Sequence, residues 1–142
     1  MASLAAVLCA VLCASAAAGA HGGGVLLREV VEGSSYNKAV LVENAGAAPV
    51  PLSDLALVLA YNGGAWGNPI PLASLGNATG AIAPGGRVWV AHPSASLPGL
   101  EGAMAAPGLL LNGDDAVGLV SGGAVVDALG AEGGAGGWSS GS

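Results

Sequence analysis

The chain has no phenylalanine, two cysteines, two histidines and three cationic side chains in 142 residues. Three cations against nine carboxylates give a net charge of -6, which argues against a nucleic-acid binder, because phosphate contacts need several Lys or Arg side chains. Charged residues are only 8% and hydrophobic residues 53%, so the chain is not disordered throughout. Its 26 glycines follow no three-residue period, which excludes collagen. The length favours one domain.

The first twenty residues are typical of a secretory signal peptide. Residues 1–20 contain no charged side chain and end in the small residues Ala18, Gly19 and Ala20. A retained signal anchor is the alternative, since about 20 apolar residues are enough to span a bilayer. We expect cleavage, and a secreted mature chain without a membrane span. Cys9 and Cys13 would leave with the signal peptide, so the mature chain would form no disulfide and use no thiol nucleophile.

The remaining sequence predicts an all-β fold. Apolar residues alternate with a period of two, which indicates β-strands, over residues 25–31, 38–43, 55–61, 87–92, 116–121 and 124–129. Turn dipeptides such as Asn62-Gly63 and Asn112-Gly113 separate them. No segment has a convincing amphipathic helical pattern. We therefore expect a β-sandwich over residues 24–130, followed by a Gly/Ser-rich tail over residues 131–142.

The last two strands allow a register to be predicted. A two-residue turn at Gly122-Gly123 places Leu119 opposite Val126 and Val117 opposite Ala128, on the face expected to line the core. Asp127 then lies opposite Gly118 and is expected to stand toward solvent.

Two stretches together match a known pattern. The first is Glu32-Gly33-Ser34-Ser35-Tyr36-Asn37-Lys38-Ala39, and the second is Leu111–Val120 followed by Val125–Gly130, with Pro51–Leu55 and Ile82–Gly85 between them in order. The chain thus resembles the lamin tail domain, in the secreted form found alone or beside extracellular nucleases, over about Gly24–Trp138. The resemblance implies an immunoglobulin-like β-sandwich that serves as an interaction or targeting module and has no catalytic residues. No heptad run is present, which excludes a filament-forming lamin.

The acidic and histidine residues give little indication of a metal site or a catalytic site. Asp114 and Asp115 are a weak candidate for a Ca²⁺ site, but two carboxylates fall short of the six or more oxygen ligands that Ca²⁺ prefers. We favour a turn in which these side chains cap backbone N–H groups. His92 lacks the nucleophile and orienting partner that a general base needs, so we favour a histidine at a strand end. We expect no enzyme activity, no cofactor and no zinc site.

Two polar or aromatic regions are candidates for binding. Ser34, Ser35, Tyr36 and Asn37 form either a contact loop or a structured turn, and we favour the turn, with Tyr36 as its exposed part. Trp66 lies in a Gly-rich loop, where it serves either as a ligand platform or as a cover for the open end of the sandwich.

Asn77-Ala78-Thr79 is a sequon for N-glycosylation, which predicts a glycoprotein if the source is eukaryotic. Together these observations predict a secreted, non-catalytic module that binds a protein or surface ligand. The alternatives are a truncated accessory domain of a secreted nuclease or phosphoesterase, or a structural component of an extracellular matrix.

Overall fold

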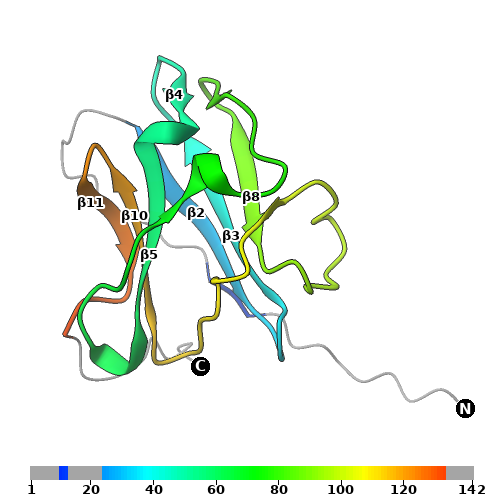
Figure 1. Cartoon of the computed structure of the whole chain (residues 1–142), viewed down its shortest axis with the longest axis vertical. Helices are drawn as coiled ribbons and strands as arrows, with labels where there is room; N and C mark the ends of the chain where they lie inside the picture. Colours follow the sequence, from blue (N-terminus) through cyan, green and yellow to red (C-terminus); the bar gives the residue numbers. More distant parts are fainter. Residues whose placement is uncertain (1–9, 13–23, 134–142) are drawn as a thin grey trace, which may run out of the picture.

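Antiparallel β-sheets dominate the computed structural model, which describes residues 10–12 and 24–133 (Figure 1). The first sheet runs in the order β1 (Ala10–Leu12), β2 (Val25–Glu32), β3 (Lys38–Asn44), β8 (Arg87–Ala91) and β9 (Met104–Ala105), with only the β8–β9 pair parallel. The second runs in the order β11 (Ala124–Leu129), β10 (Ala116–Ser121), β5 (Leu55–Ala60) and β6 (Ile70–Pro71). A small ladder joins β4 (Val50–Pro51) to β7 (Ala81–Ile82).

The predicted all-β class is confirmed, and each of the six expected strands is present. The alternation that predicted them did not reveal the two-residue strands β4, β6, β7 and β9, which are too short to show a period. Single 3-10 turns supply the helical structure of the described ranges, at η1 (Leu52–Asp54), η2 (Tyr61–Gly63) and η3 (Leu72–Ser74). No helix within these ranges is long and apolar enough to cross a membrane. Most of the predicted signal peptide and C-terminal tail lies outside the described residues.

The two sheets pack against each other over a core of aliphatic side chains. The first sheet contributes Leu27, Val40, Val42 and Val90, and the second contributes Leu57, Leu59, Val117 and Leu119. Within the described chain, every residue of this main core cluster is Val, Leu, Ile, Met or Ala. Both described tryptophans therefore lie outside it, and each covers an outer face of a sheet instead.

The β10–β11 hairpin departs from the predicted register. Gly122 and Gly123 make the turn with φ values of 60° and 84°, as the glycine pair predicts. Beyond it, however, a β-bulge leaves Val126 without a partner, so Leu119 pairs with Asp127 and Gly118 with Ala128. The predicted pairing of Leu119 with Val126 is wrong, and Val126 is 39% exposed rather than in the core. The bulge is the reason, because one extra residue reverses the faces of those that follow.

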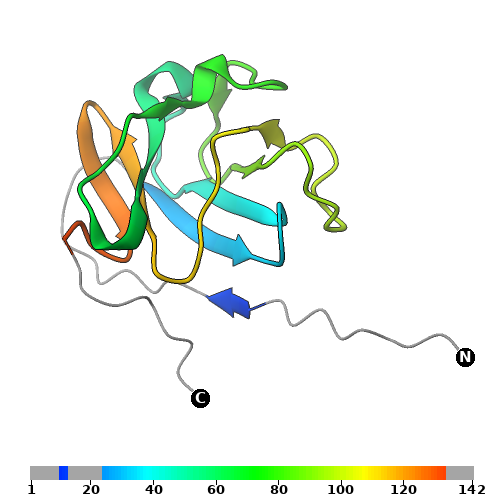
Figure 2. The same cartoon turned by 60° about the horizontal axis from the view of Figure 1, so that its bottom comes forward.

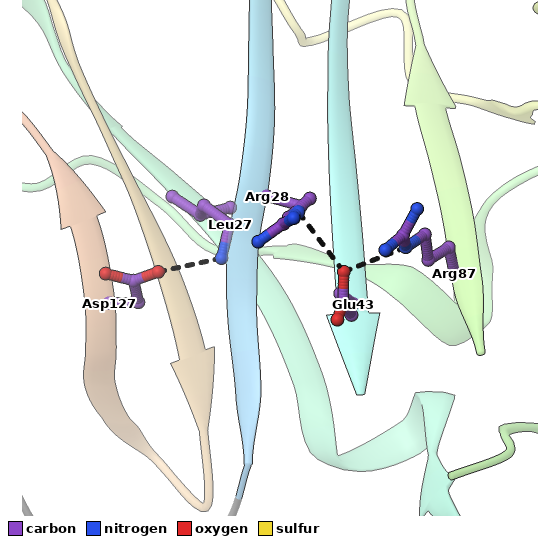
Figure 3. A network of polar contacts seen from close by, with 5 residues as sticks. All are labelled: Leu27, Arg28, Glu43, Arg87 and Asp127. Atoms are coloured by element: carbon purple, nitrogen blue, oxygen red, sulfur yellow. Dashed lines mark hydrogen bonds and ion pairs between the residues drawn. The ribbon is translucent and has the colours of Figure 1, made fainter. Parts of the chain in front are cut away.

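Asp127 is the residue that this bulge turns toward the other sheet. Its Oδ2 accepts a hydrogen bond of 2.8 Å from the backbone N–H of Leu27 in β2 (Figure 3). Its Oδ1 accepts one of 3.0 Å from the Ala128 N–H. The predicted solvent-facing position of Asp127 is thus wrong. On β2 the pairing with β3 also shifts between Leu27 and Glu29, which leaves Arg28 as an extra residue beside the contact. Two irregular strands from different sheets are therefore joined by one carboxylate.

We predict that Asp127→Ala lowers the free energy of unfolding by about 1–3 kcal/mol, because the buried Leu27 N–H loses its acceptor. Asp127→Asn keeps one acceptor oxygen and is expected to lose less. Urea denaturation of the full chain measures both. Asp114→Ala, which removes an exposed carboxylate, is the control and is expected to change stability by less than about 0.5 kcal/mol. Equal losses from Asp127→Ala and Asp114→Ala would contradict the role of Asp127.

Candidate functional site

An apolar groove of about 590 Å³ lies on the outer face of the first sheet. Its apolar lining comes from β2, β8 and the segment after β8, and consists of Val31, Trp89, Leu97, Pro98 and Leu100. Glu29, Asn37 and Ser96 add polar groups to it. Ligand sites in proteins are commonly concave and mostly apolar, with a few polar groups and volumes of roughly 300–1,000 Å³. The groove has the size and composition of such a site.

Strand alternation places Trp89 on this face. In β8, Val90 belongs to the main core, so its neighbour Trp89 lies on the opposite side of the sheet. Ala39 and Ala91, which pair across β3 and β8, are both buried in a second cluster with Val31. Their small side chains leave room for the segment that follows β8 to pack closely, and Ala95, Leu97, Leu100 and Ala103 of that segment contact the cluster. The groove lies between this segment and Trp89.

The 33–37 turn holds the wall of the groove in place. Asn37 Oδ1 accepts hydrogen bonds from the Ser96 N–H at 2.9 Å and from the Ser96 hydroxyl at 3.2 Å. Tyr36 stacks on His92, with ring centroids 4.4 Å apart and an interplanar angle of 14°. His92 Nδ1 accepts a bond of 3.1 Å from the Ser94 N–H. The turn and the segment after β8 are thus joined by a hydrogen-bonded pair and by a stacked pair of rings.

The turn itself is closed by its backbone and by a buried lysine. Gly33 N–H donates to the Asn37 carbonyl at 2.7 Å, and Ser35 adopts a positive φ of 56°. Lys38, only 4% exposed, donates from Nζ to the Gly33 carbonyl at 2.7 Å and pairs with Glu32 at 3.6 Å. The turn is therefore ordered by backbone hydrogen bonds and by Lys38, and the choice between a contact loop and a purely structural turn stays a prediction.

The structure separates the residues predicted for binding. Asn37 lines the groove, whereas the preceding Tyr36 is not among the lining residues and has 51% of its surface exposed. Ser34 and Ser35 are exposed in the same turn. Trp66 belongs to the other sheet: a Cβ added at Gly118 would lie 3.3 Å from its Cη2 atom, so the indole rests directly over Gly118 of β10. Trp66 is half-buried there and covers an outer sheet face, not an open end of the molecule.

Asp115 joins two turns. Its Oδ1 accepts from the Asn62 N–H at 2.9 Å and its Oδ2 from the Asn112 N–H at 2.8 Å, while the side chain is almost fully buried. Burial and, secondarily, the charge of Asp115 raise the pKa of the Tyr61 phenol above its usual value of 10.0. Asp114 is exposed. Across residues 10–12 and 24–133, no three His, Cys, Asp or Glu side chains come together in a way that could hold a metal ion.

The sequon asparagine is accessible. Asn77 and Thr79 are both exposed, and Asn77 adopts a positive φ of 66°. Its Nδ2 donates to the Ala103 carbonyl at 3.2 Å, close to the segment that follows β8. Glycosylation at Asn77 stays a prediction.

Two of the three cations of the chain share one carboxylate in the first sheet. Arg28 Nε lies 3.5 Å and Arg87 Nε 2.8 Å from the same oxygen of Glu43, across three neighbouring strands (Figure 3). Arg87 lies two residues before Trp89, on the same face of β8. Both guanidinium groups are more than half exposed, and Glu29, which lines the groove, is a second carboxylate next to Arg28 in the sequence.

Sequence reasoning missed most of the groove. Alternation within residues 87–92 separates Trp89 from Val88 and Val90, but the pattern alone does not show which face meets the core. Leu97 and Leu100 lie in a segment with Pro93 and Pro98, whose path no periodicity predicts.

In comparisons with known proteins, no family model, no curated protein and no solved structure matches the chain.

We predict that Asn37→Ala speeds amide hydrogen exchange at Ser96 about fivefold, because a hydrogen bond worth ~1 kcal/mol is lost. Hydrogen–deuterium exchange with mass spectrometry measures this on the full chain. Asn37→Asp keeps the acceptor and serves as one control, and Ser34→Ala in the same turn serves as another. Unchanged exchange at Ser96 in the alanine variant would show that Asn37 does not hold the groove wall.

Proposed function

We propose that this chain is a non-catalytic binding module whose ligand is a protein segment that enters the groove at Trp89. One observation carries the proposal: the groove of about 590 Å³ combines a partly exposed tryptophan and aliphatic side chains with a polar edge. Buried aromatic and aliphatic pockets with polar rims are the usual centres of protein interfaces.

The polar groups around the groove favour a role in ligand binding over one in catalysis. Asn37 and Ser96 bond to each other, and His92 is stacked on Tyr36 and accepts from Ser94. These side chains hold the wall of the groove in one shape. A wall that is already ordered reduces the entropy that a ligand must lose on binding.

We further propose that the two packed sheets form an immunoglobulin-like sandwich of the lamin tail type, and that the protein is secreted. The resemblance of residues 32–39 and 111–130 supports this, as does the packing of two sheets over one aliphatic core. The first of these stretches forms the turn beside the groove, and the second forms the β10–β11 hairpin. Under this proposal the module binds its partner through the first stretch and closes its sheets through the second.

We predict that peptides selected from a displayed random library against the full chain lose at least about tenfold in affinity when Trp89 is replaced by Ala, because truncating a central aromatic anchor costs on the order of 2 kcal/mol. Isothermal titration calorimetry measures this affinity.

Trp66→Ala is the matched control, since it removes the same side chain from the outer face of the other sheet. It is expected to leave the affinity unchanged. If the selected peptides bind Trp89→Ala as tightly as the unaltered chain, or bind only through Trp66, the proposed function is wrong.

A further inference from the structure

The strand β2 has one edge against β3 and a second edge that is shared by two other elements. Along its first half, the Leu27 N–H donates to Asp127 of β11. Along its second half, the short strand β1 pairs antiparallel with it, with Ala10 opposite Glu32, Val11 opposite Val31 and Leu12 opposite Val30. Figure 2 shows β1, in dark blue, alongside β2 at the border of the first sheet.

The part of β2 covered by β1 borders the groove. Val31 pairs with Val11 and also lines the groove, together with Glu29 of the same strand. Residues paired across a ladder share one face of the sheet. A peptide residue added opposite Val31 would therefore lie on the outer face, next to the apolar lining at Trp89 and Leu97.

The segment that covers this edge is short and apolar. β1 consists of three residues, Ala-Val-Leu, and it lies within the stretch that the sequence predicts to be a signal peptide. Sheet edges present unpaired backbone groups and accept an added strand from another chain. Strand addition draws affinity from main-chain hydrogen bonds and specificity from pockets for alternate side chains.

We propose, on the basis of the proposed function, that the Val30–Glu32 edge of β2 is a strand-addition site. Its ligand is an extended apolar segment of a partner protein, which pairs antiparallel with β2 and places the side chain opposite Val31 at the groove. In the full chain, Ala10–Leu12 occupies this edge in the register that the partner adopts. Removal of the first twenty residues would make the edge available.

The test first disrupts the pairing of β1 with β2 and then adds a peptide that can pair with the same edge. In the full chain, Ala10→Pro with Val11→Pro removes at least one ladder donor, because consecutive N–H groups point to opposite sides of a strand. Hydrogen–deuterium exchange then measures the amides of Val30–Glu32. We expect at least tenfold faster exchange in this variant, and restored protection on adding a synthetic peptide of residues 8–14 carrying C9S and C13S. The control variant is A16P with A17P, which lies outside the paired segment.

Two further measurements distinguish loss of pairing from loss of the fold. Unchanged exchange in β5 shows that the variant with Ala10→Pro and Val11→Pro retains its fold. A photoreactive group at the position of Val11 in the same peptide is expected to cross-link to β2 of the unaltered chain at high peptide concentration, whether or not that variant folds. The peptide with V11D is expected neither to protect nor to cross-link.

The inference is overturned if opening the edge leaves exchange at Val30–Glu32 unchanged, if the peptide adds no protection, or if the V11D peptide protects equally. Failure of the proposed function gives a different result. If library-selected peptides bind through Trp89 but do not protect Val30–Glu32 in the variant with Ala10→Pro and Val11→Pro, the groove is a binding site and strand addition is wrong. If Val30–Glu32 is protected but Trp89→Ala has no effect on any peptide, the strand site stands and the groove is not part of it.

Discussion

The hydrogen bond from the Leu27 N–H to Asp127 ties the β11 edge of the second sheet to β2 of the first, beside the aliphatic core over which the two sheets pack. β11 gains little from burial, since Val125 and Val126 are exposed. A polar contact therefore holds β11 against β2. Two bulges accompany it: the extra residue Val126 turns Asp127 inward, and Arg28 interrupts the β2–β3 ladder beside Leu27. β1 pairs with the second half of the same β2 edge, at Val30–Glu32.

The lack of phenylalanine has a structural counterpart. The main core is filled by aliphatic side chains, and the described tryptophans lie on the two outer faces. Trp66 rests on Gly118, where an added Cβ would lie 3.3 Å from the indole and 3.0 Å from Val58, so a larger residue at this position would require these side chains to shift. On the first sheet, the small side chains of Ala39 and Ala91 let the segment after β8 pack close to the sheet. A groove remains between this segment and the Trp89 indole. One tryptophan completes the packing of its sheet, and the other leaves an apolar surface partly open.

The sequence predicted the strands well because short apolar runs such as Leu55–Ala60 are bounded by turn residues, although both faces of that strand are buried. It failed at the bulge beside Val126, since an extra residue leaves no mark in a period of two. It also failed for the groove. The bonds from Ser96 to Asn37 and the stack of Tyr36 on His92 join residues more than fifty positions apart, and such pairs cannot be predicted from local pattern in a single chain. Asn37 and Tyr36 were candidate binding residues in the sequence. The apolar lining at Leu97 and Leu100 became evident only in the structure.

We propose that recognition takes place on the outer face of the first sheet, where the 33–37 turn, the segment after β8 and β2 line one groove. A map of backbone amide and Trp indole chemical shifts by nuclear magnetic resonance, recorded on the isotope-labelled full chain during titration with a bound peptide, tests this most directly. The account predicts that the shifted signals cluster at Val31, Trp89, Ser96, Leu97 and Leu100, while the Trp66 indole stays unmoved. Shifts that instead gather at Trp66, Val58 and Gly118 would contradict it.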